Sequence, residues 1–196
     1  MKTLCMDTSH RYLILTLIEN EAIITKFEAY AWKKQSETIF VELRKQMEQV
    51  EWEVDDLDEV VITIGPGSYT GIRIAMSIAK VLCSQKKLVL KTLSTLQLYA
   101  GLQNCSVILD ARSNRVYYGK YENGNCIEEG IKTIDEIAAM RENYIGDLQV
   151  LGLENSKIAY SENFLLLLKN AKVVAHIHQL VPQYLKAENA YLVSSS

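Results

Sequence analysis

Two aspartates, Asp7 and Asp110, each follow a short apolar run and precede a turn, a position from which a carboxylate can bind a metal ion. Asp7 ends the run Leu4-Cys5-Met6, and Asp110 ends the run Val107-Ile108-Leu109. Carboxylate oxygens are ligands that Mg²⁺ accepts together with phosphate groups. The alternative is that each aspartate hydrogen-bonds the backbone of its own turn, as aspartates at strand ends commonly do. The sequence leaves both interpretations open.

A glycine-rich loop, Gly65-Pro66-Gly67-Ser68-Tyr69-Thr70-Gly71, follows an apolar run at 60–64 and precedes a helical pattern. This order predicts a buried strand, a tight turn and a helix whose first N–H groups are capped by Ser68 or Thr70. A helix start of this kind can bind an anion. The candidate nucleotide or anion contacts are therefore Asp7, Thr8, Gly65, Gly67, Ser68 and Gly71. The glycine spacing matches neither a Walker phosphate loop nor a dinucleotide fingerprint, so a purely structural turn is the alternative.

Composition and charge limit the classes of protein that this chain can represent. The 196 residues are 48% hydrophobic and carry a net charge of −3, which predicts one large or two small folded domains with no general attraction to nucleic acid. The four cysteines are scattered without a Cys-x-x-Cys pair and are expected to be reduced thiols. No secretion signal and no apolar run of about 20 residues is evident, so we expect a cytoplasmic protein without a membrane span.

An internal repeat with an offset of 103 residues organises the chain. Residues 4–30 predict three antiparallel strands, with turns after Asp7 and at Glu19-Asn20-Glu21. The same arrangement returns at 107–131, where Asp110, Glu122 and Asn123 correspond to Asp7, Glu19 and Asn20 without a gap. Each set of strands is followed by a helix, a strand and a second helix, so the sequence predicts a duplicated βββαβα unit.

The elements after the strands differ between the two copies. In the first, a helix at 36–50 places Ile39, Phe40, Leu43, Met47 and Val50 on one face, and the glycine loop follows the next strand. In the second, we expect a short helix at 134–140, a strand at 149–151 and a helix at 156–168. Gly152 is then expected at the place of Gly65. Residues 190–196 are expected to be disordered.

A duplicated βββαβα unit is the layout of the actin-like ATPase fold, which joins two RNase H-like subdomains. The sequence predicts these subdomains at 1–100 and 101–196, the second one shorter and with a degraded glycine loop. In this architecture, a nucleotide lies in the cleft between the copies, close to the first hairpin of each. Arg112 and Arg115 flank the second hairpin, where they either face a phosphate or belong to the solvated surface.

The helix after the glycine loop has two apolar stripes, although a helix on a sheet needs only one. Ile72, Ala75, Ala79 and Leu82 form the first stripe, and Ile74, Ile78 and Val81 form the second. Either both stripes are buried within this chain, or one of them binds a partner or a second copy. The partner interpretation predicts an interface made by Ile72, Arg73, Ala75, Met76, Ala79 and Lys80.

Several blocks of the sequence resemble the TsaB (YeaZ-like) family, which is related to the glycoprotease and TsaD family. The most specific is Gly-Pro-Gly-Ser-Tyr-Thr-Gly-Ile-Arg at 65–73. Others are Met-Asp-Thr-Ser at 6–9, Leu-Ser-Thr-Leu at 93–96, Leu-Asp-Ala-Arg at 109–112 and Val-Pro-Gln-Tyr-Leu at 181–185. One departure is Gln35, which stands where the family usually has a histidine.

This resemblance implies a non-catalytic scaffold subunit in the synthesis of threonylcarbamoyladenosine in tRNA. The expected partners are the catalytic paralogue TsaD and the ATPase TsaE, with tRNA contacted indirectly through the complex and a homodimer as another form. No intrinsic cofactor is expected, and ATP or ADP with Mg²⁺ at the joint with the partner is the candidate ligand. The resemblance also implies that pairing uses the N-terminal subdomain.

The histidines and nucleophiles of the chain agree with a protein that is not an enzyme on its own. The active paralogue holds its metal with a His-x-x-x-His pair, whereas the three histidines here, His10, His176 and His178, contain no such pair. No Gly-x-Ser-x-Gly elbow is present. The alternatives that stay open are a small-molecule kinase or ATPase of the actin-like fold and a glycoprotease-like peptidase.

Overall fold

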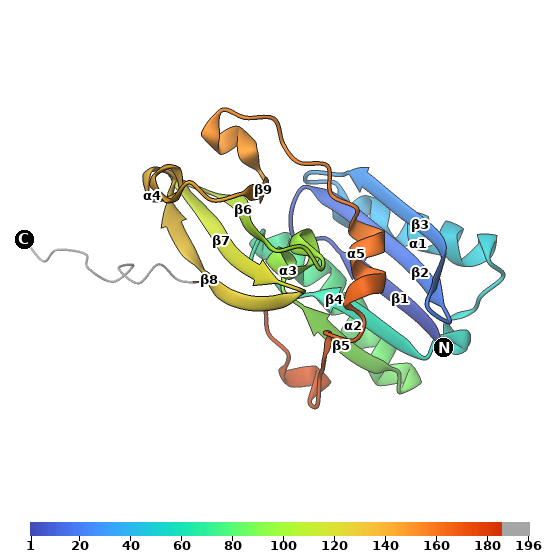
Figure 1. Ribbon diagram of the computed structural model, residues 1–196. Helices are drawn as coiled ribbons and strands as arrows, with labels where there is room; N and C mark the ends of the chain where they lie inside the picture. Colours follow the sequence, from blue (N-terminus) through green and yellow to red (C-terminus); the bar gives the residue numbers. More distant parts are fainter. Residues whose placement is uncertain (186–196) are drawn as a thin grey trace, which may run out of the picture.

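The computed structural model describes residues 1–185 and contains two β-sheets with helices on their faces (Figure 1). The six-stranded sheet has the order β10-β5-β4-β1-β2-β3 and the four-stranded sheet the order β8-β7-β6-β9. Each sheet contains three consecutive antiparallel strands, β1–β3 in the first sheet and β6–β8 in the second. A later strand, β4 or β9, pairs parallel with the first strand of its set. The strands of the first sheet are β1 (Lys2–Asp7), β2 (Tyr12–Glu19), β3 (Ala22–Tyr30), β4 (Glu59–Thr63), β5 (Val89–Leu93) and β10 (Lys172–Val173).

The second sheet repeats the first at the predicted offset. Its strands are β6 (Cys105–Arg112), β7 (Arg115–Glu122), β8 (Asn125–Thr133) and β9 (Tyr144–Gly146). Even the irregularities correspond, because the register of β2–β3 shifts between Leu17 and Ile18 and that of β7–β8 shifts between Lys120 and Tyr121. The turn residues Asn20 and Asn123 both have φ 49°. The two sheets therefore confirm the duplicated RNase H-like, actin-like fold.

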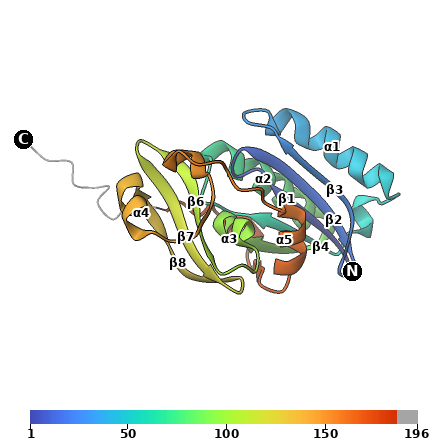
Figure 2. The same ribbon diagram turned by 45° about the horizontal axis from the view of Figure 1, so that its top comes forward.

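The helices form two layers around the first sheet (Figures 1 and 2). On one face, α1 and α2 share a core with Leu4, Met6 and Val60. On the other face, α3 and α5 pack against Cys5 and Val61 together with residues of the second sheet, so they lie between the sheets. The helices are α1 (Gln35–Gln49), α2 (Tyr69–Lys86), α3 (Thr95–Ala100), α4 (Ile134–Met140) and α5 (Tyr160–Leu167).

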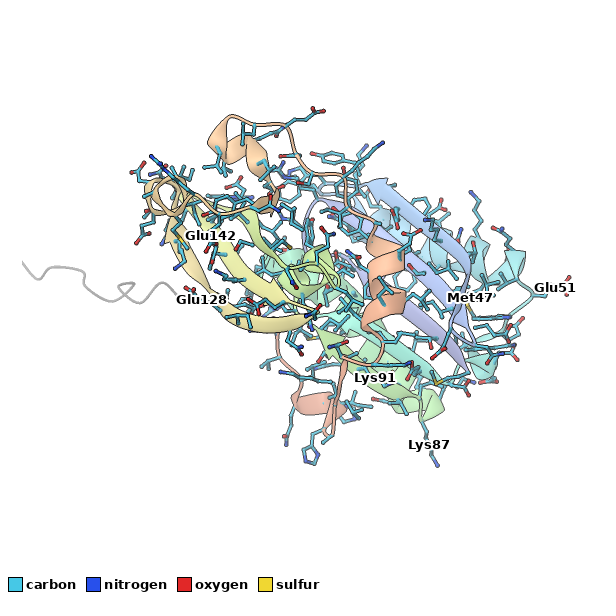
Figure 3. All side chains as sticks on the ribbon, viewed as in Figure 1. Met47, Glu51, Lys87, Lys91, Glu128 and Glu142 are labelled. Atoms are coloured by element: carbon cyan, nitrogen blue, oxygen red, sulfur yellow. The ribbon has the colours of Figure 1, made fainter. Side chains whose placement is uncertain are left out.

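The far side of the second sheet is covered by α4. Ile108, Val116, Tyr118 and Ile137 form a small core there. Figure 3 shows Glu128 on β8 and Glu142 in the segment between α4 and β9, on the opposite side of the molecule from Met47 and Glu51 at the end of α1. The carboxylate of Glu142 accepts hydrogen bonds from Ser106, Tyr118 and Lys120, and the bond from Ser106 leads the effects that lower its pKa.

Three predictions for the second copy were wrong. Residues 149–151 are not a strand but part of a 3₁₀ helix, Leu148–Leu151, and the strand is β9, a few residues earlier. Gly152 therefore ends this 3₁₀ helix and does not take the place of Gly65. The last helix, α5, begins at Tyr160 instead of Ser156. Val150 and Leu151 are partly buried by this helical turn, against the small core that α4 and β6 share, and a short apolar run allows this solution as readily as a strand.

The face of α1 also differs from the prediction at one residue. Phe40 is 63% exposed, whereas Ile39 and Met47 are buried. Gln46 is buried against the sheet instead. Its side-chain oxygen accepts a hydrogen bond from the Thr25 hydroxyl on β3 at 2.5 Å.

Two further expectations concern the limits of the molecule. The division at residue 100 stays a prediction, and β10 from the second part of the chain adds an edge strand to the first sheet.

The segment 190–196 lies outside the described residues. Among residues 1–185, no helix combines the length and the apolar character that crossing a bilayer requires.

Candidate functional site

A cleft of about 670 Å³ lies where the first hairpins of the two sheets face each other. The β1–β2 and β6–β7 turns form two of its walls, and the start of α2 and the segment after β3 form the others. The lining residues are His10, Arg11, Tyr30, Trp32, Gly67, Ser68, Tyr69, Thr70, Asp110, Ala111, Arg112, Tyr117 and Tyr184. The cleft thus has the place that the fold predicts for a ligand between the two copies.

Asp7 lies beneath the cleft and is 1% exposed. Its Oδ1 accepts a hydrogen bond from the backbone N–H of Ser9 at 2.8 Å and another from the hydroxyl of Thr63 on β4. Burial raises the pKa of Asp7, and the hydrogen bonds from Ser9 and Thr63 oppose this shift. Asp7 could either bind a metal ion or hydrogen-bond the backbone of its own turn. The geometry matches the second interpretation.

Asp110 makes the same turn in the second copy. Its Oδ1 accepts from the backbone N–H of Arg112 at 2.8 Å, the same two-residue spacing as at Asp7, and its Oδ2 lies 3.5 Å from the guanidinium of Arg11. Within residues 1–185, no three Asp, Glu, His or Cys side chains come together as a metal-binding group. The presence of ATP, ADP or Mg²⁺ at a joint with a partner stays a prediction.

The glycine loop is packed directly against the β1–β2 turn. The backbone N–H of Ser68 donates to the carbonyl of Ser9 at 2.7 Å, and the Thr8 hydroxyl donates to the carbonyl of Gly71 at 2.6 Å. A Cβ atom on Gly67 would lie 2.2 Å from the Ser9 carbonyl oxygen, and one on Gly71 would lie 2.2 Å from that of Thr8. These two glycines are therefore required by the close approach of two backbones.

The remaining loop residues also have structural partners. Gly65 has φ 112°, and a Cβ atom there would lie 2.6 Å from the carbonyl oxygen of Gln183. The Ser68 hydroxyl caps α2 by accepting from the N–H of Gly71 at 3.2 Å, as predicted. Of the six candidate anion contacts, only Gly67 and Ser68 line the cleft, while Asp7, Thr8, Gly65 and Gly71 support it from below.

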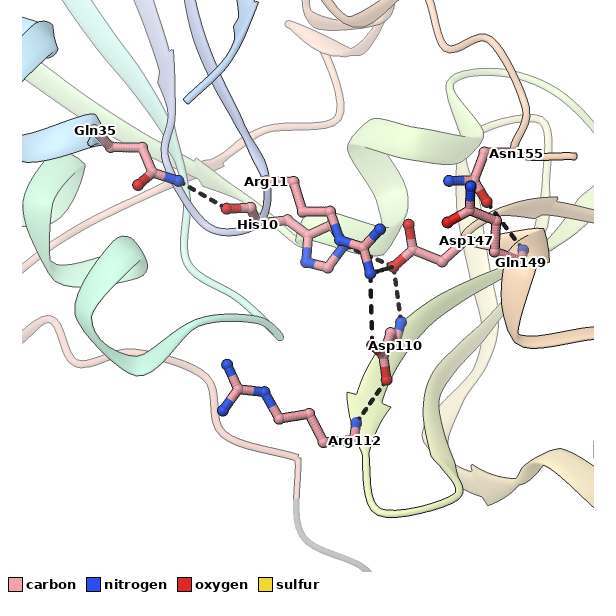
Figure 4. A network of polar contacts seen from close by, with 8 residues as sticks. All are labelled: His10, Arg11, Gln35, Asp110, Arg112, Asp147, Gln149 and Asn155. Carbon is pink, nitrogen blue, oxygen red and sulfur yellow. Dashed lines mark hydrogen bonds and ion pairs between the residues drawn. The ribbon is translucent and has the colours of Figure 1, made fainter. Parts of the chain in front are cut away.

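A polar network joins the two copies across the cleft (Figure 4). His10 Nε2 lies 2.7 Å from Asp147 Oδ2, and the same oxygen accepts from the backbone N–H of Asp110 at 2.9 Å. Arg11 lies 3.5 Å from Asp110 and 3.8 Å from Asp147. The side-chain amide of Gln35 donates to the carbonyl of His10 at 2.9 Å, so the residue that departs from the family pattern positions this turn.

Asp147 is the centre of this network. Burial opposes its ionisation, but the hydrogen bond and charge of His10, the N–H of Asp110 and the charge of Arg11 outweigh burial and lower its pKa. A carboxylate accepts hydrogen bonds and donates none, so the proton of the contact resides on His10 Nε2. The network thus joins the first hairpin to the second copy beside the cleft.

The open part of the cleft is lined by aromatic rings and arginines. The Arg112 guanidinium lies 6.0 Å from the centroid of the Trp32 ring. At the start of α2, the Arg73 guanidinium lies 3.8 Å from the centroid of Tyr69, and Tyr69 stacks on Tyr184 with 5.6 Å between centroids. These are cation–π and stacking contacts that a flat aromatic ligand can extend. Arg112 thus faces the cleft, whereas Arg115 does not line it.

The predicted interface residues on α2 divide into two groups. Ile72, Ala75, Met76 and Ala79 are buried within this chain, so they cannot contact a partner in this conformation. Arg73 is exposed, while Lys80 is half-buried and donates to the backbone carbonyl of His178 at 3.1 Å.

The second apolar stripe of α2 is only partly covered. Ile78 is buried and Ile74 is half-buried, but Val81 is 55% exposed. An interface on α2 stays a prediction. The exposed side chains of α2 that could contact a partner include Arg73, Ser77 and Val81.

Sequence reasoning missed the pair of His10 and Asp147 and the place of Trp32. His10 stands in the first turn three residues after Asp7, which is a usable signal for a side chain at the cleft. The role of Asp147 could not be predicted, because the strand was expected at 149–151, after Asp147. In the structure, Asp147 directly follows the strand β9. Trp32 follows β3 by two residues, and nothing in its local sequence indicates that the chain returns to the cleft there.

The comparisons with known proteins find one family model and several relatives, all concerned with threonylcarbamoyladenosine in tRNA. The family model of tRNA N6-adenosine threonylcarbamoyltransferase (TsaD) matches residues 29–189. The chain is 26% identical to the tRNA threonylcarbamoyladenosine biosynthesis protein TsaB of Bacillus subtilis (strain 168), over 97% of this chain and 96% of that protein.

Two solved structures from Pseudomonas aeruginosa are similar in fold. One is described as an uncharacterized protein with similarity to peptidase YEAZ, with a TM-score of 0.79 and 18% identity, and the other as YeaZ, with a TM-score of 0.74 and 19% identity. Each similarity covers 94% of this chain and 99% of the other.

Proposed function

The chain belongs to the TsaB (YeaZ-like) family, and we propose that it is a scaffold subunit, without catalytic activity of its own, that binds and stabilises a TsaD-type catalytic partner. Its involvement in the synthesis of threonylcarbamoyladenosine in tRNA follows from the family. In our proposal, the chain helps to shape the nucleotide and tRNA sites of the partner, and a TsaE-type ATPase joins the complex.

The observation that carries this proposal is the set of exposed apolar side chains on α1 and α2. Phe40 and Val41 on α1 are 63% and 64% exposed, and Val81 on α2 is exposed to a similar degree. Both helices bury their other sides in one core and cover the same face of the first sheet (Figure 2). Exposed apolar side chains on the outer sides of both helices favour association with another protein. A second copy of the chain is the alternative occupant when the partner is absent.

The positions of the histidines support a subunit without catalysis. His10 is held by Asp147, and His176 and His178 lie at a short 3₁₀ helix, Ile177–Gln179, beside α2. Two metal-binding histidines on one helix face, as in the catalytic paralogue, need a spacing of four residues that this chain lacks. Asp7 and Asp110 are occupied by hydrogen bonds of their own turns, which disfavours the kinase alternative.

Titration calorimetry with the TsaD-type protein of the same organism tests the proposal. We expect a complex, and we expect formation of the modified adenosine to require both proteins. Magnesium-dependent ATP turnover by this chain alone, lost in an Asp7→Asn variant that remains folded, would instead indicate a kinase or ATPase. Cleavage of a generic peptide by the chain alone would indicate a peptidase.

A further inference from the structure

We propose that the cleft between the two hairpins binds unpaired nucleotides of an RNA directly. This inference rests on the proposed function for the identity of the RNA, a tRNA, but goes beyond it because that function gives the chain only an indirect contact with tRNA. The cleft holds about 670 Å³, within the range of small-molecule sites. Its surface chemistry combines planar cations with exposed aromatic rings, which is the combination that single-stranded nucleic acids require.

Arg112 provides a cation for the RNA backbone. It is exposed at the tip of the β6–β7 hairpin, and within residues 1–185 no carboxylate forms an ion pair with it. Its guanidinium already lies over the Trp32 ring at 6.0 Å, so a base that stacks on Trp32 brings its phosphate close to this arginine. Arg11 contributes less, because Asp110 and Asp147 offset its charge.

The aromatic side chains at the rim provide the stacking surfaces. Tyr69 is 58% exposed and Tyr30 is 63% exposed, so both rings offer apolar surface to a ligand in the cleft. The Tyr69 ring is also held in place by its neighbours, since Tyr184 lies parallel to it within 14° at 5.6 Å between centroids and the Arg73 guanidinium lies 3.8 Å from its centroid. A base added to this side of the cleft therefore meets a surface that is already held in place.

Unpaired RNA fits this cleft better than a magnesium nucleotide does. A magnesium triphosphate needs free carboxylates close to its phosphates. Asp7 is buried beneath the cleft in hydrogen bonds to Ser9 and Thr63, and Asp110 is paired with Arg11. Single phosphates between stacked bases need only isolated cations, and Arg112 and Arg73 are of that kind. A base-paired duplex hides the faces of its bases and cannot use the aromatic rings.

Trp32 itself gives a local readout of binding. The chain has two tryptophans, and the other, Trp52, is buried beneath Lys2 on the opposite face of the first sheet from the second sheet. In a Trp52→Phe chain, the fluorescence of Trp32 alone is followed while RNA is added. The probes are a stem–loop RNA with an unpaired loop, the same strand fully base-paired, and free AMP as the mononucleotide arm.

We expect the stem–loop RNA to quench Trp32 and to bind more tightly than the duplex and than AMP. Arg112→Ala and Tyr69→Ala should each weaken loop binding by about tenfold, in line with the cost of losing one base-stacking or phosphate contact. Arg112→Ala should also flatten the salt dependence by about 0.7 in the logarithmic slope. Arg115→Ala, which removes a cation of the same hairpin outside the cleft, should leave binding unchanged.

Three results would overturn the proposal. They are equal binding of loop and duplex, an Arg115→Ala effect as large as that of Arg112→Ala, and quenching of Trp32 by the TsaD-type protein but not by RNA. The partner complex separates this inference from the proposed function. A chain that binds the partner but no loop RNA contradicts only the inference, and a chain that binds loop RNA but no partner contradicts only the proposed function.

Discussion

His10 Nε2 of the first hairpin lies 2.7 Å from Asp147 Oδ2 in the second copy, and both side chains are buried. The contact joins the two halves of a duplicated fold beside the cleft between them. Because Asp147 also accepts from the N–H of Asp110, one carboxylate holds both hairpins. This side of the cleft is therefore a structural joint between the two copies.

Replacing Asp147 by asparagine should lower the free energy of unfolding by about 2 kcal/mol, the cost of weakening charge-assisted hydrogen bonds to buried partners. Urea unfolding followed by circular dichroism measures the change. Asp55→Asn is the matched control, since Asp55 pairs with Lys86 on the exposed surface and should change nothing measurable. An equal effect of the two substitutions would show that the joint does not stabilise the fold.

The stability should also depend on pH through Asp147. Its pKa is lowered in the folded state, so its contribution is present above the ordinary value of about 4 and is lost as the pH falls through the lower folded value. The wild type should therefore lose more stability on acidification to about pH 3 than Asp147→Asn does. The raised pKa of Asp7 acts in the opposite direction, but it is common to both proteins and cancels in their difference. Parallel urea curves at each pH provide the comparison, and identical pH profiles would contradict the assignment.

Two substitutions at Asp7 separate its structural role from a metal-binding one. Asp7→Asn keeps an acceptor for Ser9 and Thr63 and removes a buried charge, so stability at neutral pH should be maintained or raised. Asp7→Ala leaves both donors unpaired and should cost about 2 kcal/mol or more. Thermal unfolding of the two variants measures the contrast. If asparagine destabilised the protein as strongly as alanine, the carboxylate charge itself would matter.

The glycine loop should not tolerate even a methyl group at two positions. Gly67→Ala and Gly71→Ala each place a Cβ atom 2.2 Å from a backbone oxygen of the β1–β2 turn, so one backbone must move. We expect each to cost about 3 kcal/mol, in the upper range for single substitutions. Gly130→Ala is the control, because nothing lies within 4 Å of a Cβ atom there. Unfolding midpoints near the wild type for Gly67→Ala would show that the loop relaxes freely.

Much of the fold was accessible from the sequence because duplication leaves the same polar turn residues in both copies. Asp7 and Asp110 indicated the two hairpins, and the offset of 103 residues located every strand of the two antiparallel sets. The second half of the second copy was harder to predict. A short apolar run at 149–151 has no periodicity that separates a strand from a 3₁₀ helix, so β9 and α5 were misplaced.

Sequence reasoning located elements of the cleft only where their residues are close in sequence. It located the glycine loop and the two hairpins, but the packing of the loop against Thr8 and Ser9 depends on the tertiary structure. The pairing of His10 with Asp147 spans 137 residues and has no local pattern. On α2, periodicity identified two apolar stripes but could not tell which one the sheet covers. The structure buries Ile72 and Ala75 and leaves Val81 exposed.

The most direct test of the scaffold role is the affinity of the TsaD-type partner for two matched variants. Phe40→Glu puts a charge on the exposed layer of α1, whereas Ile127→Glu puts one on β8, where Ile127 is 56% exposed on the second sheet. Calorimetric titration should show partner binding weakened by at least about tenfold, or about 1.4 kcal/mol, for Phe40→Glu and unchanged for Ile127→Glu. Wild-type affinity in Phe40→Glu, or a loss confined to Ile127→Glu, would contradict docking through the α1 and α2 layer.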